Sequence, residues 1–379
     1  MSEGHGARSG ARLRLARQAR GLSQLQMASV AGVSRQAVSA IESGISDPSL
    51  RVALALARAL GLTVEDLFGP DNPVMPVAAT PVAPLGGQGA RVTLASMGDG
   101  YVALPLRGVT VSRAGFLPAG GLVTGTDRHR GRASRKVRPI GPPRPTLVAA
   151  GCDPALPLLE APLGLLDPPV VFSWWPCPSR EALQLAADRL VHVAGTHLRG
   201  QDSEYNVGPA AELLREGGEV IGFCSWQEGL VLRPELADGI SGLQDVAESG
   251  LRLVNREPGA EARSLLDREL ADAGIEGSQL PGYDTHADGH LQVAAAIAAG
   301  LADAGIASEP AALAYDLVFV PLAAEHFDLV IPAAQASTRE VQGLLKVLSS
   351  AWLLEQLANL PGYDAGRCGE RIAALPPRH

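Results

Sequence analysis

The chain has 379 residues, and its hydrophobic content of 46% is enough to form the cores of two or three domains. Its net charge of −8 argues against a general nucleic-acid binder. No apolar run reaches about 18 residues, so we expect no membrane span. The four cysteines are widely spaced without a C-x-x-C pair, which favours reduced thiols over a disulfide scaffold or a zinc site. Without an N-terminal secretion signal, we expect a cytoplasmic protein.

Charge is distributed unevenly along the chain. Residues 1–68 carry eight Arg against five Asp or Glu, a net charge of +3, and residues 91–145 carry a net charge of +8. Residues 146–379 carry a net charge of −18. Any contact with nucleic acid is therefore predicted in the first 145 residues, with the acidic part held away from it.

The first organised stretch reads as two short helices joined by a tight turn. Ser23 is placed to cap a helix over residues 24–30, and Ser34 to cap a second helix over residues 35–42. Gly32 lies in the turn between them, where the backbone reverses and glycine adopts unusual dihedral angles most easily. This is the plan of a helix-turn-helix, whose second helix enters the major groove of DNA.

The second helix has an apolar face and a polar face. Val38 and Ile41 point inward at i, i+3 spacing, which places Arg35, Gln36 and Ser39 on the outer face. Arg can read guanine bidentately and Gln can read adenine, so this outer face suits base recognition. The alternative is an ordinary pair of packed helices with a solvated polar face.

The wider run over residues 9–68 resembles the five-helix, all-α domain of Cro and phage-repressor type (XRE) regulators. The resemblance rests on the G-V-S-R turn, the I-E-S-G exit and the terminal E-D-L-F. It implies that Gln24 contacts a phosphate and that the second helix reads bases. One departure is that residues 46–48, Ser-Asp-Pro, follow the exit where the family often has Lys or Arg. The predicted DNA-contacting residues are Gln24, Ser34, Arg35, Gln36 and Ser39.

Two segments of different composition follow. Residues 69–90 are dense in Pro, Gly and Ala and are predicted to form a linker or extended arm. Residues 91–145 contain short β-branched runs separated by Gly and Asp-Gly turns, which predicts a small β-rich segment. Its basic stretch T-D-R-H-R-G-R-A-S-R-K-V-R-P is either a phosphate-contacting patch or a solvated loop.

From residue 146 to residue 379 the pattern alternates between short apolar strands and amphipathic helices. Such alternation is typical of parallel α/β sheets whose two faces are covered by helices. The run 317–332 is predicted to contribute two strands. A length of roughly 230 residues suits two lobes.

Polar residues cluster in four loops of this α/β part. In open α/β sheets, ligands lie at the carboxyl ends of strands and against helix N-termini. Free amides, hydroxyls and arginines in such loops would suit an anionic ligand. The candidate ligand-binding residues are Cys152, Asp153, Ser173, Trp174, Thr196, His197, Glu204, Asn206, Asn255, Arg256 and Arg263.

Residues 146–370 resemble the periplasmic-binding-protein-like (type II) domain that is found fused to Cro-type domains and to molybdenum-cofactor proteins. The resemblance rests on A-G-C-D-P-A-L-P-L-L, A-G-T-H-L with S-E-Y-N, Q-E-G-L-V-L, L-V-N-R-E-P-G with A-R-S-L-L-D, and P-G-Y-D. It implies a two-lobed domain akin to molybdate- and tungstate-binding proteins. Residues 259–263 depart from the family's Gly-Ser-Gly-Thr-Arg loop, and the carboxylate at Glu261 disfavours oxyanion contact there.

Several of these residues also have plain structural readings. Cys152 can be a small buried hydrophobe, His197 a strand cap, and Trp174 a core residue. Glu204 and Asn206 can stabilise a turn. The D-T-H-A-D-G-H run holds His286, Asp288 and His290, for which helix capping is favoured over a metal site, so we predict no metal.

Enzyme signatures are absent from the sequence: there is no G-x-S-x-G, Walker, H-E-x-x-H or helix-opening G-x-G-x-x-G motif. We therefore predict a non-enzymatic, multidomain, one-component transcription regulator that pairs as a homodimer on a double-stranded operator. Its ligand is predicted to be molybdate, tungstate or a molybdopterin-type species, with no covalent cofactor. The alternative is a cytoplasmic carrier of an oxyanion or pterin.

Overall fold

The computed structural model describes residues 3–69, 75–129, 132–141, 144–199 and 205–378. The chain divides into two compact units, Met1–Met75 and Pro76–His379. Among the described residues, no helix has both the length and the apolar character needed to cross a membrane.

The first unit is a bundle of helices around one small core. Ser23 and Ser34 cap α2 and α3 as predicted, because each side-chain oxygen accepts a hydrogen bond from the third residue of its helix. Gly32 has a φ of 65° at the turn between them, which glycine adopts without strain. The core is built from Leu13, Met27, Val38, Ile41, Leu56, Leu60 and Leu67. The helices are α1 (Glu3–Ala19), α2 (Gln24–Ala31), α3 (Arg35–Glu42), α4 (Leu50–Leu60) and α5 (Val64–Phe68).

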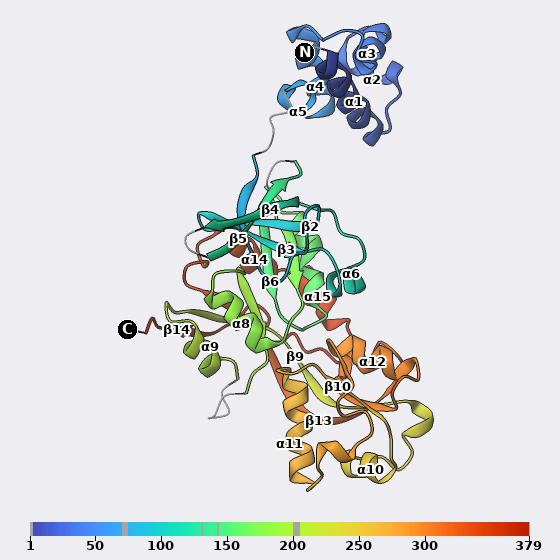
Figure 1. Cartoon of the computed structure of the whole chain (residues 1–379), viewed down its shortest axis with the longest axis vertical. Coiled ribbons are helices and arrows are strands. Elements are labelled where there is room, and N and C mark those ends of the chain that lie inside the picture. The colour runs from blue at the N-terminus through green and yellow to red at the C-terminus, as the bar shows by residue number, and fades with distance from the viewer. Residues whose placement is uncertain (1–2, 70–74, 130–131, 142–143, 200–204, 379) are drawn as a thin grey trace. The chain divides into compact units, whose positions relative to one another are not determined.

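The second unit begins with a small closed β-barrel (Figure 1), in the strand order β1-β3-β2-β4-β5. Residues 91–145 form most of this barrel, which agrees with the predicted β-rich segment. The prediction of a linker over residues 69–90 is wrong for Val77–Pro81. This segment forms β1, which pairs with β3 and β5 and closes the barrel. Its flanking prolines resemble a linker in sequence, yet they lie at the strand ends, where proline is tolerated. The other elements are β2 (Arg91–Met97), β3 (Gly100–Pro105), α6 (Val109–Ala114), β4 (Gly121–His129) and β5 (Arg132–Pro139).

A two-lobed α/β domain follows, built on a nine-stranded sheet. The first lobe contains β6 (Thr146–Ala150), β7 (Val171–Trp175), β8 (Val193–Thr196) and β14 (Arg371–Leu375). The second lobe contains β10 (Leu253–Arg256), β11 (His286–Ala287) and β12 (Ala304–Ser308). Two long strands, β9 (Gly218–Leu232) and β13 (Val318–Pro332), run through both lobes.

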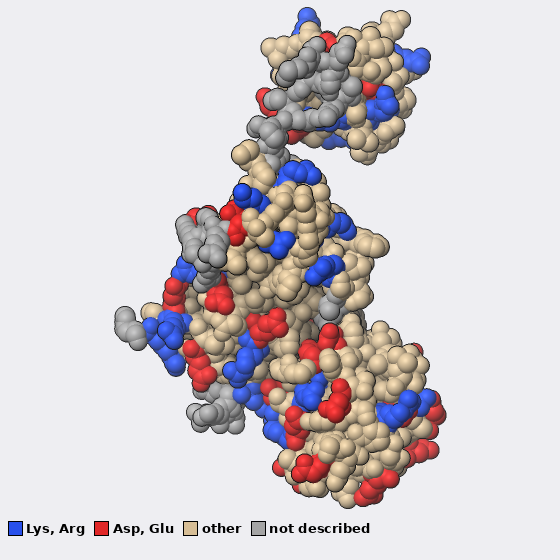
Figure 2. Space-filling view, viewed as in Figure 1, with Lys and Arg blue, Asp and Glu red and all other residues tan. Residues whose placement is uncertain are grey.

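Helices cover both faces of each lobe, as the strand–helix alternation predicts. In the first lobe α7, α14 and α15 pack on one face and α8 and α9 on the other, and in the second lobe α10 and α11 lie opposite α12 and α13. Figure 2 shows acidic side chains spread over the second lobe. The helices are α7 (Glu160–Gly164), α8 (Ser179–Ala187), α9 (Val207–Leu213), α10 (Leu243–Glu248), α11 (Glu261–Asp272), α12 (His290–Ala298), α13 (Glu309–Leu313), α14 (Arg339–Leu348) and α15 (Ala351–Ala358).

Two details of the sheet differ from the sequence prediction. The run 317–332 forms one strand, β13, because irregularities at Pro321–Ala323 and Phe327–Asp328 bend it without ending its pairing with β9. The sheet is also mixed, since β9 and β13 are antiparallel to each other while β6, β7 and β8 are parallel. This antiparallel pair joins the two lobes.

Candidate functional sites

The outer face of α3 is exposed, as a recognition helix requires. Arg35, Gln36 and Ser39 are exposed, while Val38 and Ile41 are buried beneath them. Ser34 Oγ accepts a hydrogen bond from the amide of Ala37 at 3.1 Å, so this side chain fixes the start of the helix. Arg35 and Gln36 therefore project from the first turn of a capped helix.

Gln24 belongs to a buried ion-pair network. Its Nε2 donates to Glu42 Oε2 at 2.9 Å, and Arg17 binds both oxygens of the same carboxylate at 2.6 and 3.1 Å. Burial raises the pKa of Glu42, but the bonds from Arg17 and Gln24 outweigh that effect and lower it. Gln24 thus ties α2 to the end of α3, and its predicted phosphate contact stays a prediction.

Two candidate residues of the first lobe follow the carboxyl ends of neighbouring parallel strands. Cys152 lies two residues beyond β6, and His197 directly follows β8, which pairs with β6. Both are buried. A Cβ at Gly195 would lie 2.4 Å from the Phe327 ring, so glycine is needed where β8 crosses that ring. The sheet topology therefore brings the Cys152 and His197 loops together.

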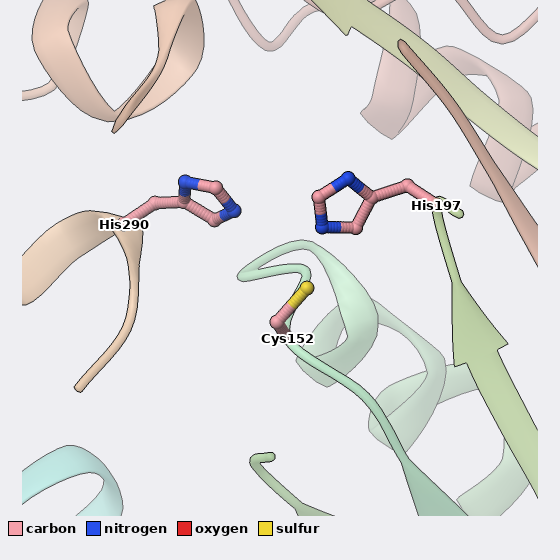
Figure 3. A group of neighbouring side chains, drawn as sticks. All are labelled: Cys152, His197 and His290. Atoms are coloured by element: carbon pink, nitrogen blue, oxygen red, sulfur yellow. The ribbon is translucent and has the colours of Figure 1, made fainter. Parts of the chain in front are cut away.

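His290 of the second lobe completes this cluster. It is the first residue of α12 and is buried, following Gly289, whose φ of 111° suits glycine. The Cys152 sulfur, one ring nitrogen of His197 and one ring nitrogen of His290 lie within 4.8 Å of one another. In Figure 3 the two imidazole rings face each other from opposite sides, with the sulfur beneath them.

Two buried carboxylates flank the cluster where β9 and β13 pass from lobe to lobe. Glu325 Oε2 lies 3.6 Å from Nδ1 of His197, and Glu228 Oε1 lies 3.8 Å from Nδ1 of His290. Arg199 Nε lies 3.6 Å from Glu325 Oε1. None of the four carboxylate oxygens accepts a hydrogen bond from any residue that the structure describes. Such groups are costly in a core, which makes the crossing a candidate binding position.

The electrostatics of the cluster couple its members. Burial lowers the pKa of His197, but the Cys152 sulfur, Glu325 and Glu228 outweigh that effect and raise the pKa well above its usual range. Burial raises the pKa of Glu228 to about 7, with His197 opposing the rise and Glu325 adding to it. The ring of Trp226 packs edge-on against both imidazoles, with centroid distances of 5.1 Å to His197 and 5.3 Å to His290.

Arg256 ends β10 and is buried beside the cluster. Its Nε and Nη2 donate to Glu257 at 2.7 and 2.9 Å, while Nη1 has no hydrogen-bond partner among the described residues. Arg263 donates to the carbonyl of Arg256 at 3.3 Å and lies over the Tyr283 ring. Asn255 donates to the carbonyl of Tyr283 at 3.2 Å and accepts from the Arg256 amide at 2.8 Å. Asn255 and Arg263 therefore hold Arg256 in place.

Among the remaining predicted residues, Asp153, Trp174 and Asn206 bond to the surrounding framework. Asp153 accepts hydrogen bonds from Trp226 at 2.8 Å and Tyr363 at 3.1 Å, and Trp174 Nε1 donates to the Gly151 carbonyl at 2.8 Å. Asn206 binds the Leu198 amide at 2.7 Å and Asp328 at 2.7 Å. Ser173 lies within β7, opposite Val148. Thr196 ends β8, with an Oγ1 that has no hydrogen-bond partner in the described ranges. Glu204 lies outside the described residues.

Sequence reasoning missed Glu228, Glu325 and the role of His290 in the cluster. A carboxylate inside an apolar strand is a signal in itself, because Asp and Glu are rarely fully buried unless they are paired. His290 is buried while the neighbouring His286 and Asp288 are exposed, so the D-T-H-A-D-G-H run does not act as one group.

Comparisons with known proteins agree with this architecture. Residues 13–67 match the family described as helix-turn-helix, and residues 163–349 match the PBP superfamily domain. The uncharacterized HTH-type transcriptional regulator MJ0272 of Methanocaldococcus jannaschii is 47% identical over 47 residues, which cover 12% of this chain and 71% of that protein. The chain belongs to the helix-turn-helix regulators of the Cro and phage-repressor type. Its second part is a PBP-like ligand-binding domain.

Two further proteins are similar to this chain. The uncharacterized protein YvgK of Bacillus subtilis is 30% identical over 144 residues, 38% of this chain and 46% of YvgK, so the match spans about half of that relative. A solved structure, the tungstate ABC transporter from Geobacter sulfurreducens, is 14% identical with a TM-score of 0.44 and covers 56% of this chain and 98% of that one. The two matched families are regulator and binding-protein types.

Proposed function

We propose that this helix-turn-helix regulator binds operator DNA through α3 and that a small ligand held between the two lobes controls this binding. One observation carries the proposal. Cys152 and His197 of the first lobe meet His290 of the second lobe within 4.8 Å, beside the two strands that join the lobes. A ligand bound there touches both lobes at once.

A bridging ligand can act only through its different affinity for closed and open lobes. Cys152, His197 and His290 are all buried in this structure, so a ligand enters when the lobes separate and favours their closure. A hundredfold preference for the closed state corresponds to about 2.7 kcal/mol, enough to shift a balanced equilibrium almost completely. Since the lobes and the helix-turn-helix belong to one chain, such a shift can be passed to DNA binding.

The site holds groups that favour an anionic ligand and groups that oppose one. The predicted molybdate or tungstate finds support in Arg256 Nη1 and in the hydroxyls of Thr196 and Ser308, none of which has a hydrogen-bond partner among the described residues. Against an oxyanion stand Glu228 and Glu325, two buried carboxylates that repel a dianion. Oxyanions are therefore one ligand class to test and cations the other.

Dimerisation and location complete the proposal. A single helix-turn-helix reads only a half-site, so we propose that the chain pairs on near-palindromic DNA in the cytoplasm, with half-sites about 34–36 Å apart or multiples of that distance. A carrier of an oxyanion or pterin would need no sequence-specific DNA contact. DNA selectivity thus separates the two functions.

The test is selection of duplex DNA from a random library by the full-length protein. Parallel selections use wild-type protein, Arg35→Ala on α3 and Arg268→Ala, whose exposed side chain lies on α11 of the second lobe. We expect a near-palindromic sequence to be enriched by wild type and Arg268→Ala, with its base preference relaxed by Arg35→Ala. Absence of any enriched sequence would overturn regulation in favour of a carrier.

A further inference from the structure

We propose that Cys152, His197 and His290 bind one thiophilic transition-metal ion between the lobes, zinc(II) or copper(I), and that this ion is the controlling ligand. The second half of the statement rests on the proposed function. Sequence alone did not point to this site, since the three residues are 45 and 93 positions apart in turn and the run around His290 suggested a helix cap.

The donor set selects this class of ion. A thiolate ligand favours zinc and copper(I), and imidazole suits the same metals, whereas magnesium and calcium prefer sites made of oxygen ligands. Two imidazoles and one thiolate leave a fourth position open, as in zinc sites with three protein ligands. Cys152 and His197 lie in loops after two strands of the first lobe and His290 begins α12 of the second lobe, so the sheet topology rather than one local turn builds the site.

The distances suit a site that tightens on binding. With bonds of about 2.3 Å to sulfur and about 2.0–2.1 Å to nitrogen, tetrahedral ligands lie roughly 3.4–3.6 Å apart. The donor atoms of Cys152, His197 and His290 lie within 4.8 Å of one another. An approach of about 1 Å between the lobes and a small side-chain adjustment would therefore complete the geometry. Metal binding and lobe closure are then one event.

The two carboxylates orient the imidazoles. Metal-binding histidines usually donate their second ring nitrogen to a carboxylate or carbonyl, which fixes the ring. Glu325 lies 3.6 Å from Nδ1 of His197 and Glu228 lies 3.8 Å from Nδ1 of His290, so we assign Nε2 of each ring to the metal. Nδ1 of His290 accepts a bond from the Ser308 amide at 3.2 Å here. Metal binding through Nε2 puts the ring proton on Nδ1, so this bond must break and Nδ1 must turn to Glu228 instead.

Charge also decides for a cation. A zinc ion beside the Cys152 thiolate carries a net charge of +1, which Glu228 and Glu325 can compensate, while Arg256 is already paired with Glu257. A dianion in the same place would meet the thiol and both buried carboxylates. The oxygens of Glu228 and Glu325 have no hydrogen-bond partner among the described residues. A bound cation would therefore attract these carboxylates, whereas a bound anion would repel them.

The experiment measures metal binding by the full-length protein under reducing conditions. Metal-free protein is titrated with zinc(II) against a competing chelator, and separately with copper(I), while Trp226 fluorescence reports the site. Cys152→Ser and His290→Asn are compared with Cys368→Ser and His286→Asn, matched changes outside the cluster. Cobalt(II) gives a sulfur-to-metal charge-transfer band where the thiolate is a ligand. Glu325→Gln tests the positioning role, and circular dichroism checks folding.

We expect one zinc or copper ion per chain, an affinity at least about 100-fold weaker in Cys152→Ser and His290→Asn, and unchanged binding in both controls. Glu325→Gln should weaken binding by about 10–100-fold with the cobalt band retained. Binding unaffected by Cys152→Ser and His290→Asn, or no stoichiometric binding of either ion, overturns the site.

Operator affinity, measured alongside, separates the two proposals. Tight metal binding that leaves operator affinity unchanged overturns metal as the controlling ligand, while the metal site stands and ligand control is decided by the response to molybdate and tungstate. A response to molybdate or tungstate by protein that binds neither metal supports the proposed function and overturns the metal inference.

Discussion

Replacing His192 with Asn should make the two-lobed domain more resistant to acid. His192 is buried before β8, and its Nδ1 accepts a hydrogen bond from the Val148 amide at 3.0 Å. Burial lowers its pKa to about 4, whereas the unfolded chain titrates near the ordinary value of 6.5. Between these two values the unfolded state holds a proton that the folded state lacks. The free energy of unfolding contributed by this group is therefore intact above pH 6.5 and falls as pH drops.

The loss follows from the two pKa values. One pKa unit corresponds to about 1.4 kcal/mol, so the full effect below pH 4 is about 3 kcal/mol, and about 2 kcal/mol has been lost at pH 5. The carbonyl oxygen of Asn can accept the Val148 bond without titrating. The variant should then gain about 2 kcal/mol relative to wild type on moving from pH 7 to pH 5.

Urea unfolding of the full-length protein measures this difference. Fluorescence of Trp174, Trp175 and Trp226 reports the two-lobed domain, and a constant ionic strength with chelator present excludes metal effects. All other titrating groups affect wild type and variant alike, so the difference between the two proteins isolates His192. A difference that is the same at pH 5 and pH 7 would refute the argument that burial keeps this imidazole neutral.

Three further predictions concern function and stability. Arg35→Ala should weaken operator binding by about 1–3 kcal/mol and relax selectivity at one base pair, measured by anisotropy on single-base operator variants. Glu42→Gln leaves the buried Arg17 without its counter-ion and should destabilise the helical unit by about 3–5 kcal/mol. Hydrogen exchange in α1–α4 should then be faster, whereas Glu65→Gln at an exposed position should change the exchange little. Arg256→Ala should abolish the ligand response of operator binding but keep the affinity without ligand, and a normal response in that variant would show that Arg256 is structural.

The parts of the fold that were predictable are those set by local pattern. The caps at Ser23 and Ser34 and the burial of Val38 and Ile41 follow from spacing within a few residues, and the structure confirms them. β1 could not be found in the same way. Val77–Pro81 becomes a strand because it pairs with β3 and β5. Both partners come later in the chain, so the local sequence does not reveal the pairing.

The candidate site was predictable in part for a similar reason. Cys152 and His197 each follow a strand, so the rule for parallel sheets places their loops at one edge. His290 joins them from the other lobe through β9 and β13, a pairing whose register no local sequence pattern reveals. Glu228 and Glu325 meet there because those two strands cross between the lobes side by side.

Operator affinity of the full-length protein, measured with each ligand probe, tests the central claim most directly. The probes are zinc(II), copper(I), molybdate and tungstate, each compared with chelator-treated protein and with Cys152→Ser and Arg256→Ala. Ligand control by the interlobe site predicts a change of at least about tenfold with one probe. Cys152→Ser should lose a response to a metal ion and Arg256→Ala a response to an oxyanion, each keeping the affinity without ligand. The same operator affinity with every probe, in wild type as in the variants, would contradict it.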